Sequence, residues 1–514
     1  MSTASIEGEN LGRRPRAADR ATGRPVWKGL LPGAAGTLVA AAGALIAVGC
    51  FLGLYVRPTS DDWCAAWKSR DLGVLGITSD FYRTQNGRVA NAFLSGVFYG
   101  DGLAGIKILP TVIAVTFTAG LVLLGREFVR LIGGRPRLLI LTACSLVVQA
   151  LLYYAGTRSY QVLLWAPATI SHTVPSVIGV WALLLGIRTV RHRRAAVRAG
   201  GFAAAFFIGF ALGTLSEPFA LVSGLLAAGA GLLSLPRLGL ARNRRPSTWC
   251  LLWCAGLVCG LVVLYTSPGA RWRRAQQPDK ESPLAASELR GAFEDWLHMW
   301  HSVTGQWAYL GAVAVGVLLG LGSRLHGPLG PAAAGREPRR AVPRHMLVML
   351  LLLPVPVVVL GSFAVVVGLR SGYGPSGWTY ARTWTSYLVP MELALCGYGA
   401  LWGVRGGRWS AGRRNSGTLL GACTVAAACL GLASVAALVP NVRQLTTVTV
   451  ARAVAWDAQN SRIRAEAAQG AAAVGYRPLY IGGLAEPFFT ADYERDWVAA
   501  CVSKWYRVDR IHRR

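Results

Sequence analysis

Charged residues are scarce in this chain. They make up 15% of its 514 residues, whereas a soluble protein would have roughly a quarter. Hydrophobic residues make up 53%, and many gather in blocks of about 18–25, the length that a helix needs to cross a hydrocarbon core of about 30 Å. The scarcity of charge excludes a soluble globular protein of this size. It predicts an all-α polytopic membrane protein whose helices pack against one another in lipid.

Nucleotide-binding signatures are lacking too. The chain has no Walker loop, no dinucleotide fingerprint and no nucleophile elbow in a suitable context, so we expect no chemistry driven by cytoplasmic ATP. Most of its ten cysteines lie inside apolar runs. Cys250, Cys254 and Cys259 share one run with no His or acidic residue nearby, and they are interpreted as small hydrophobic side chains rather than metal ligands.

Acidic residues are also few, since 24 Asp and Glu stand against 53 Lys and Arg, for a formal net charge of +29. We expect no nucleic-acid partner, because the arginines gather in alternate linkers between apolar runs, which is the positive-inside pattern of a membrane protein. These linkers are 13–28, 126–137, 188–198, 237–245, 324–344 and 405–414. The pattern places them, and the N terminus, in the cytoplasm.

The apolar runs predict about 11 transmembrane helices, and an odd number leaves the C terminus outside the cell membrane. The runs lie near 32–56, 105–125, 138–156, 162–187, 200–216, 217–235, 249–266, 303–322, 346–369, 383–404 and 417–439.

Three parts of the chain follow from this pattern. Residues 1–30 form a basic cytoplasmic tail that we expect to be disordered. Residues 31–439 form the transmembrane domain, with a first outer loop at 57–104. Residues 440–514 form a small extracytoplasmic α/β segment, with a helix near 447–470, a strand at 477–481 and a helix near 492–505.

Two adjacent carboxylates, Asp61 and Asp62, follow the first apolar run. Like charges at this boundary repel. One could act as a general base toward a hydroxyl while the other orients that hydroxyl or binds a divalent cation. A plain helix start is the competing interpretation, since Asp is common there. Arg88, later in the same loop, could bind a phosphate or a sugar, or could be an ordinary exposed residue.

Three further residues lie at the expected outer boundary. Glu217 separates two apolar runs, and an acid at that depth faces a cavity, a partner or the headgroups. Arg271 and Arg382 stand on the outer side, against the inside bias. A guanidinium can bind phosphate through two parallel hydrogen bonds, although contact with bulk anionic headgroups would also explain both arginines.

Several short motifs occur in the order known from one class of membrane enzyme. They are Ser60-Asp61-Asp62, Asn86-Gly87-Arg88, the run from Trp165 to Pro175, Ser216-Glu217, Ser267-Pro268-Gly269-Ala270-Arg271, and the tail from Trp456-Asp457 to Trp505-Tyr506. With the first span and the outer tail, they resemble the GT-C class of membrane glycosyltransferases, and more closely an uncharacterised family of bacterial polytopic proteins related to it. The resemblance covers most of the chain after residue 50. His172 and Ala270 depart from it, since an aromatic residue and Asn are expected there.

The resemblance implies transfer of a sugar from a polyprenyl-phosphate carrier to a glycan or lipid acceptor on the outer face of the cell membrane, in envelope glycan or glycoconjugate assembly. Asp61 or Asp62 would take the proton of the acceptor hydroxyl. Arg271, Arg382 and Arg88 would hold the leaving phosphate, with Glu217 among the substrate-binding candidates. Two other functions stay open: a transporter or lipid-carrier flippase without covalent chemistry, and a non-catalytic partner of envelope assembly enzymes.

Only Cys64 and Cys501 lie clearly outside the membrane in this topology. They could form a disulfide, which persists outside the cytoplasm and would tie the tail to the first loop as a lid. They could also be two isolated small residues. Bonded cysteines need Cα atoms within about 7 Å, so the structure decides between the two.

Reporter tags test the topology. Tags placed in 190–198, 240–246 or 330–340 should be cytoplasmic, and tags at 280 or after 445 should be outside, because alternating arginine clusters set the direction of insertion. Fusions to reporters that are active on one side of the membrane measure this. A cytoplasmic C terminus would contradict the odd number of spans.

Overall fold

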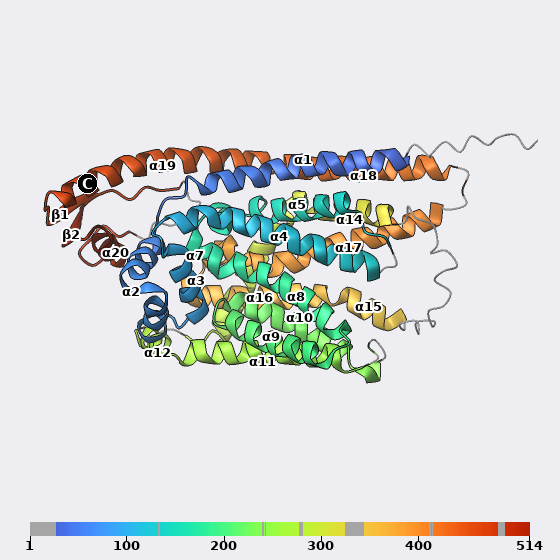
Figure 1. Cartoon of the computed structure of the whole chain (residues 1–514), viewed down its shortest axis with the longest axis horizontal. Coiled ribbons are helices and arrows are strands. Elements are labelled where there is room, and N and C mark those ends of the chain that lie inside the picture. The colour runs from blue at the N-terminus through green and yellow to red at the C-terminus, as the bar shows by residue number, and fades with distance from the viewer. Residues whose placement is uncertain are drawn as a thin grey trace, which may run out of the picture.

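The computed structural model describes residues 27–514 except 132–133, 239–240, 242, 277–280, 324–343, 411–412, 414 and 482–488. Most of the expected basic tail at 1–30 therefore lies outside the described residues. In the described part, long helices run side by side in one bundle, and a smaller cap covers one end of it (Figure 1). The cap combines the first loop with the C-terminal segment, which are far apart in the chain.

The long and apolar helices form the bundle. They are α1 (Trp27–Gly53), α4 (Ala104–Leu131), α5 (Leu138–Tyr154), α8 (Val174–Arg191), α9 (Ala195–Gly213), α10 (Glu217–Leu233), α11 (Arg245–Thr266), α14 (Leu310–Ser323), α15 (Arg344–Leu352), α16 (Pro354–Tyr373), α17 (Thr385–Ser410) and α18 (Ser416–Ala436).

The remaining elements are shorter or less apolar. They are α2 (Asp61–Thr84), α3 (Val89–Tyr99), α6 (Tyr160–Leu163), α7 (Ala166–Ala168), the π-helix η1 (Thr169–Thr173), η2 (Pro236–Leu238), α12 (Pro268–Ala275), α13 (Ala286–Thr304), η3 (Trp307–Tyr309), η5 (Gly377–Thr379), η6 (Ala381–Trp384), α19 (Val439–Ala468), β1 (Ala473–Tyr476), α20 (Trp497–Tyr506) and β2 (Arg510–Arg513).

Eight helices among the described residues are long and apolar enough to cross a membrane, judged by length and composition. A ninth candidate is the bent pair Ala286–Thr304 and Trp307–Ser323, whose parts meet at 65°. The helices α5 and α10 are apolar but have only 17 residues each. The chain is therefore an all-α polytopic membrane protein, as the sequence predicts. Fewer helices meet this criterion than the predicted number of about 11 spans.

Glycines bring two pairs of bundle helices into backbone contact. On α14, Gly316 and Gly320 lie against backbone carbonyls of α17, and on α17, Gly399 and Gly403 lie against backbone carbonyls of α14. This is the small-xxx-small spacing that lets helices approach closely in lipid, where no hydrophobic force drives them together. The pair α9 and α11 uses the same spacing, with Gly209, Gly213, Gly256 and Gly260.

The C-terminal segment differs from the sequence prediction in its details. The prediction of a strand at 477–481 is wrong, because those residues pair with no other strand among the described residues. The strand lies just before them, in β1, which pairs in parallel with β2. The last helix begins at Trp497, where Asp496 caps it by accepting the N–H groups of Val498 and Ala499 at 2.7 and 3.0 Å. The helix expected near 447–470 starts earlier and runs from Val439 to Ala468.

The variant Gly399→Leu tests the close approach of α14 and α17. A side chain at this position would meet the backbone carbonyl of Val313, which cannot move aside as a side chain would. Overpacking costs about 1–3 kcal/mol, so we expect the melting temperature in detergent to fall by several degrees. Gly406→Leu is the matched control, since it lies on the same helix with nothing within 4 Å of an added Cβ. Equal melting temperatures for the two variants would contradict the prediction.

Candidate active site at the capped end of the bundle

Motifs distant in sequence meet where the cap joins the bundle. Gly87, with a φ of 75°, lies against Ser267, and a larger side chain there would collide with it. Asn91 of α3 donates from Nδ2 to Ser171 Oγ of η1 at 2.8 Å. The first loop is thereby joined to the segments around residues 171 and 267, so three of the motifs that carry the resemblance lie in contact.

Asp61 is the first residue of α2, and its side chain is exposed. The preceding residue, Ser60, has a φ of 49°, which a non-glycine residue adopts only at an energetic cost. Although solvent reaches Asp61, the protein around it removes enough water to raise its pKa above the usual range, and the charges of Arg382, Arg273 and Arg88 oppose that rise. Asp61 is therefore an accessible carboxylate within electrostatic reach of three arginines.

Asp62 is buried, with 1% of its surface exposed. One carboxylate oxygen accepts the backbone N–H of Thr59 at 2.8 Å, and the other accepts the hydroxyl of Tyr99. Burial raises the pKa of Asp62 to about 7 and the neighbouring Asp61 adds to the rise, while the two hydrogen bonds oppose it. The two adjacent acids thus have different environments, since Asp62 joins the start of α2 to α3 and Asp61 faces accessible space.

Arg88 and Glu217 form an ion pair between the first loop and the start of α10. Arg88 Nη2 lies 2.9 Å from Glu217 Oε2, and Nε and Nη2 donate to Oε1 at 3.2 and 3.1 Å. The backbone N–H of Arg88 donates to Asn86 Oδ1 at 3.1 Å. This forked contact fixes the plane of the guanidinium, and a carboxylate at a helix N-terminus is favourably placed.

Arg382 of η6 is buried, with 6% of its surface exposed. Its Nη1 donates to Gln161 Oε1 at 2.8 Å, and its guanidinium carbon lies 4.6 Å from the ring centroid of Tyr380, 5.2 Å from that of Trp165 and 6.0 Å from that of Tyr373. No ion pair within 4.0 Å among the described residues includes Arg382. A buried guanidinium thus stands among aromatic rings and amides rather than beside a carboxylate.

His172 lies in the π-helical turn η1, a local geometry that is frequent at functional sites. Its Nδ1 is buried without a hydrogen-bond partner among the described residues. Its backbone carbonyl accepts the hydroxyl of Thr385 at 3.0 Å, which joins η1 to the start of α17. His172 was noted in the sequence only as a departure from an expected aromatic residue.

The structure gives Arg271 and Arg273 different roles. Arg271 is exposed and donates from Nε to the carbonyl of Thr266 at 2.8 Å. Its neighbour Arg273, one of three arginines that follow the same apolar run, acts electrostatically on Asp61. Sequence reasoning missed Arg158, whose guanidinium carbon lies 5.0 Å from the Tyr380 ring that Arg382 also contacts. Its place in a turn that the sequence pattern predicts to be outside, against the inside bias, could have pointed to it.

The C-terminal segment holds the residues that lead into Asp61. Arg452 of α19 is buried and donates to three backbone carbonyls, those of Arg57, Pro58 and Leu479, at 3.0, 2.7 and 2.9 Å. Arg57 in turn pairs with Asp457 at 2.7 Å. These contacts fix the backbone just before α2 to α19 and to the chain that follows it.

Trp63 of α2 extends this contact into the cap. Its ring is completely buried and lies 5.8–6.5 Å, between centroids, from four aromatic rings of the C-terminal segment. These rings belong to Trp456, Tyr476, Trp505 and Tyr506. The aromatic residues of the distant tail motif therefore pack around the residue two positions after Asp61.

Cys64 and Cys501 are bonded, with their Cα atoms 4.9 Å apart, so the structure decides for the disulfide over two isolated cysteines. One and a half turns further along α2, Arg70 donates to the carbonyls of Trp505 and Lys504 at 2.7 and 3.0 Å. The bond and these contacts hold α20 against α2.

An apolar cavity of about 740 Å³ lies within the bundle between α4, α5, α8, α10, α11, α16 and α17. Ser176 and Ser386 line it, and they lie four residues, about one helical turn, after His172 and Arg382. Arg191, at the other end of α8, also lines it. The cavity therefore runs along α8, beginning close to the buried Arg382.

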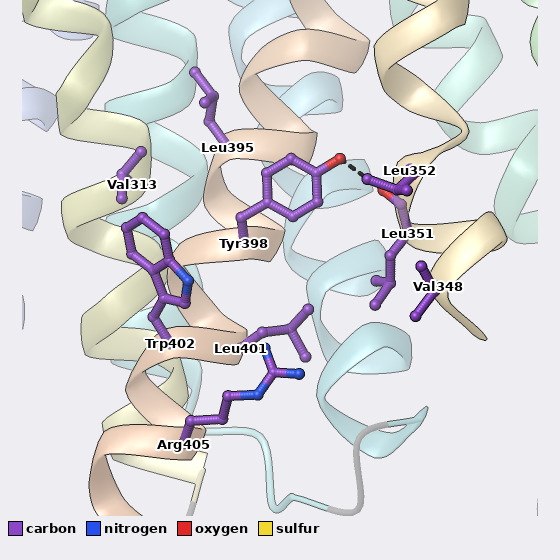
Figure 2. A pocket seen from close by; sticks show the side chains of 9 residues that line it. All are labelled: Val313, Val348, Leu351, Leu352, Leu395, Tyr398, Leu401, Trp402 and Arg405. Carbon is purple, nitrogen blue, oxygen red and sulfur yellow. Dashed lines mark hydrogen bonds between the residues drawn. The ribbon is translucent and has the colours of Figure 1, made fainter. Parts of the chain in front are cut away.

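A smaller pocket of about 380 Å³ lies between α14, α15 and α17 (Figure 2). The hydroxyl of Tyr398 donates to the carbonyl of Leu351 at 2.6 Å across it, and Arg405 is the one charged residue in its lining. None of the candidate site residues lines this pocket, so it is separate from the candidate site.

No three His, Cys, Asp or Glu side chains in the described ranges come together as a metal-binding group. No family model, no curated protein and no solved structure matches the chain. The chemistry of the site itself therefore carries the functional conclusion.

The variant Asp62→Asn should remove a pH dependence of stability. Because burial raises the pKa of Asp62 from 3.8 to about 7, the folded protein keeps a proton that the unfolded chain releases between these values. The resulting stability is present near pH 4 and is lost as the pH rises through about 7. We expect the melting temperature of the wild type in detergent to fall by several degrees between pH 5 and 8 relative to the variant.

Asp101→Asn is the control for this measurement, since Asp101 is an exposed acid in the same loop and should leave the wild-type dependence unchanged. Parallel curves for the wild type and Asp62→Asn would contradict the assignment of the buried proton to Asp62.

Proposed function

We propose that the chain transfers a sugar from a polyprenyl-phosphate carrier to an acceptor hydroxyl at the outer face of the cell membrane, in envelope glycan or glycoconjugate assembly. One observation carries this proposal. The exposed Asp61 lies within electrostatic reach of the buried Arg382, and the apolar cavity begins about one helical turn from that arginine. A base, a cation and an apolar space are the three features that such a transfer needs.

The roles follow from the chemistry of transfer. Asp61 accepts the proton of the acceptor hydroxyl, and the hydroxyl oxygen attacks the anomeric carbon of the sugar with inversion. The bond from that carbon to the phosphate oxygen breaks, and its electron pair stays on the phosphate. Arg382 and Arg88 offset the growing negative charge, which is the larger part of such catalysis. Arg273, the third arginine whose charge acts on Asp61, adds to this positive charge.

Asp61 rather than Asp62 is the proposed base. Both oxygens of Asp62 already accept hydrogen bonds from Thr59 and Tyr99 in a buried position, whereas Asp61 is exposed. Glu217 is proposed to orient Arg88 through their ion pair. The positive charge near Asp61 comes from arginines, and the proposed transfer uses these arginines rather than a divalent cation.

The apolar cavity is proposed to hold part of the lipid chain of the carrier. Its lining is predominantly hydrophobic, and burying apolar surface is favourable in proportion to its area. The phosphate would then lie near Arg382, with the chain directed along α8 toward the other end of the bundle.

The topology proposed with this function has about 11 spans, the N terminus in the cytoplasm, and the cap and C terminus outside. Support comes from the eight candidate spans, the bent pair that ends in α14, and the two apolar helices of 17 residues, α5 and α10. Each of these corresponds to one apolar run of the sequence.

A lipid-carrier flippase is the second candidate function. The cavity extends from Ser386 to Arg191, and a path along the depth of the bundle would suit movement of a lipid. Such a protein makes and breaks no covalent bond, so it has no need of a general base at Asp61. A non-catalytic assembly partner would likewise need no general base at Asp61.

The variant Asp61→Asn separates these functions. Loss of a general base typically lowers the rate by about 10²–10⁴-fold, so sugar transfer should disappear while the amount of protein in the membrane stays unchanged. Glycan analysis of a deletion strain complemented with each variant measures this. Asp101→Asn, an exposed acid of the same loop, should retain transfer. Wild-type glycans with Asp61→Asn would favour transport or scaffolding instead.

A further inference from the structure

Gln161 of α6 is completely buried and its amide is held in one orientation. Its Oε1 accepts Nη1 of Arg382 at 2.8 Å. Arg382 can only donate, so the carbonyl oxygen of the amide must face it and the NH₂ group points elsewhere. That group, Nε2, is buried and has no hydrogen-bond partner among the described residues.

Trp165 presents a second donor of the same kind. Its side chain is 2% exposed, and its Nε1 has no hydrogen-bond partner within the described part of the chain. The ring lies 5.2 Å from the guanidinium carbon of Arg382. An indole N–H and an amide NH₂ can donate but not accept, so two residues that each contact Arg382 carry a buried donor without a partner among the described residues.

Burying donors without acceptors costs free energy, as does burying a charge without a counter-charge. A water molecule would satisfy the N–H groups only partly, because it offsets no charge and brings hydrogens that need acceptors of their own. An oxyanion meets all three requirements, since its oxygens accept from several directions and its charge matches that of Arg382.

We propose that Gln161 and Trp165 donate hydrogen bonds to the phosphate of a lipid carrier, which Arg382 binds through its charge. Gln161 then has two tasks. Its carbonyl oxygen positions the guanidinium, and its amide N–H holds a phosphate oxygen. The identity of the lipid rests on the proposed function, whereas the site for a phosphate rests on the buried donors themselves.

The contacts place this phosphate relative to the rest of the site. Among the charged groups that act on Asp61, Arg382 has the strongest effect. Ser386, which lines the apolar cavity, lies about one turn further along the chain. A phosphate bound here has the base on one side and the space for its lipid chain on the other.

The variant Gln161→Glu tests the proposal with almost no change of shape. The introduced carboxylate faces Arg382, neutralises it and supplies no N–H for the ligand. We expect the affinity of the purified full-length protein in detergent for polyprenyl phosphate to fall at least about tenfold, since hydrogen bonds to charged groups are the strong ones. The melting temperature without lipid should not fall, because the buried charge gains a partner. A purely structural role for Gln161 predicts the opposite change in stability.

Trp165→Phe is the second variant, because it keeps the ring and removes only the N–H. We expect a severalfold loss of affinity for polyprenyl phosphate. Trp67→Phe is its matched control, since the Nε1 of Trp67 is likewise buried without a partner among the described residues but lies in the cap beside Lys504. This control should bind like the wild type. If Gln161→Glu lowers the melting temperature, its affinity no longer reports on phosphate binding alone, and the affinity of Trp165→Phe then tests the proposed site.

Polyprenol and inorganic phosphate complete the titrations. The wild type should bind polyprenyl phosphate more tightly than it binds either polyprenol or inorganic phosphate. Inorganic phosphate bound as tightly as polyprenyl phosphate would overturn a lipid ligand, and polyprenol bound as tightly would overturn a phosphate site. Unchanged affinity in both Gln161→Glu and Trp165→Phe would overturn the role of these two residues. Sugar transfer that still depends on Asp61 in that case would leave the proposed function standing.

Discussion

The contact between Arg452 and the backbone before α2 is the constraint on which the site depends. One buried guanidinium binds the carbonyls of Arg57, Pro58 and Leu479, so it fixes the exit of α1 and the chain that follows α19 in a single geometry. Because a guanidinium offers its donors in a rigid plane, little freedom is left to the turn at Ser60. That turn has an unfavourable backbone conformation, which persists only when its surroundings hold it.

The disulfide and the aromatic cluster strengthen the same contact from the other side. Trp63 is surrounded by rings from the C-terminal segment, and Cys64 is bonded to Cys501. A bridge that closes a loop of this length, with a sequence separation of 437, restricts the unfolded chain, which is worth about 6 kcal/mol by loop entropy alone. The cap therefore acts as part of the site, since it determines where Asp61 stands relative to the bundle.

The bundle supplies the buried cation of the site, Arg382. Glycines bring α14 and α17 into close contact, and the short helix η6, directly before α17, carries Arg382. The charge of Arg382 is expensive in this setting, and aromatic rings and Gln161 offset only part of that cost. An accessible carboxylate on the cap thus lies within electrostatic reach of a buried cation on the bundle.

Local properties of the sequence determined the class of this protein and many of its candidate site residues. Long apolar runs and alternating arginine clusters predict an all-α membrane protein, and the few residues of unusual charge at the predicted outer boundary include Asp61, Arg88, Glu217 and Arg382. The sequence also limited a possible disulfide to Cys64 and Cys501, because the other cysteines lie in apolar runs, but only the structure shows that the two are bonded. Each of these features depends on a residue and its immediate neighbours.

Tertiary structure alone decided how these residues divide their roles. Nothing in the pair Asp61-Asp62 indicates that one carboxylate is buried against Tyr99 and the other exposed, since burial depends on α3 and the C-terminal segment. The ion pair of Arg88 with Glu217, the choice of Arg273 rather than Arg271 near Asp61, and the pairing of β1 with the last residues of the chain have the same origin. Contacts between segments hundreds of residues apart follow from packing, which no local pattern records.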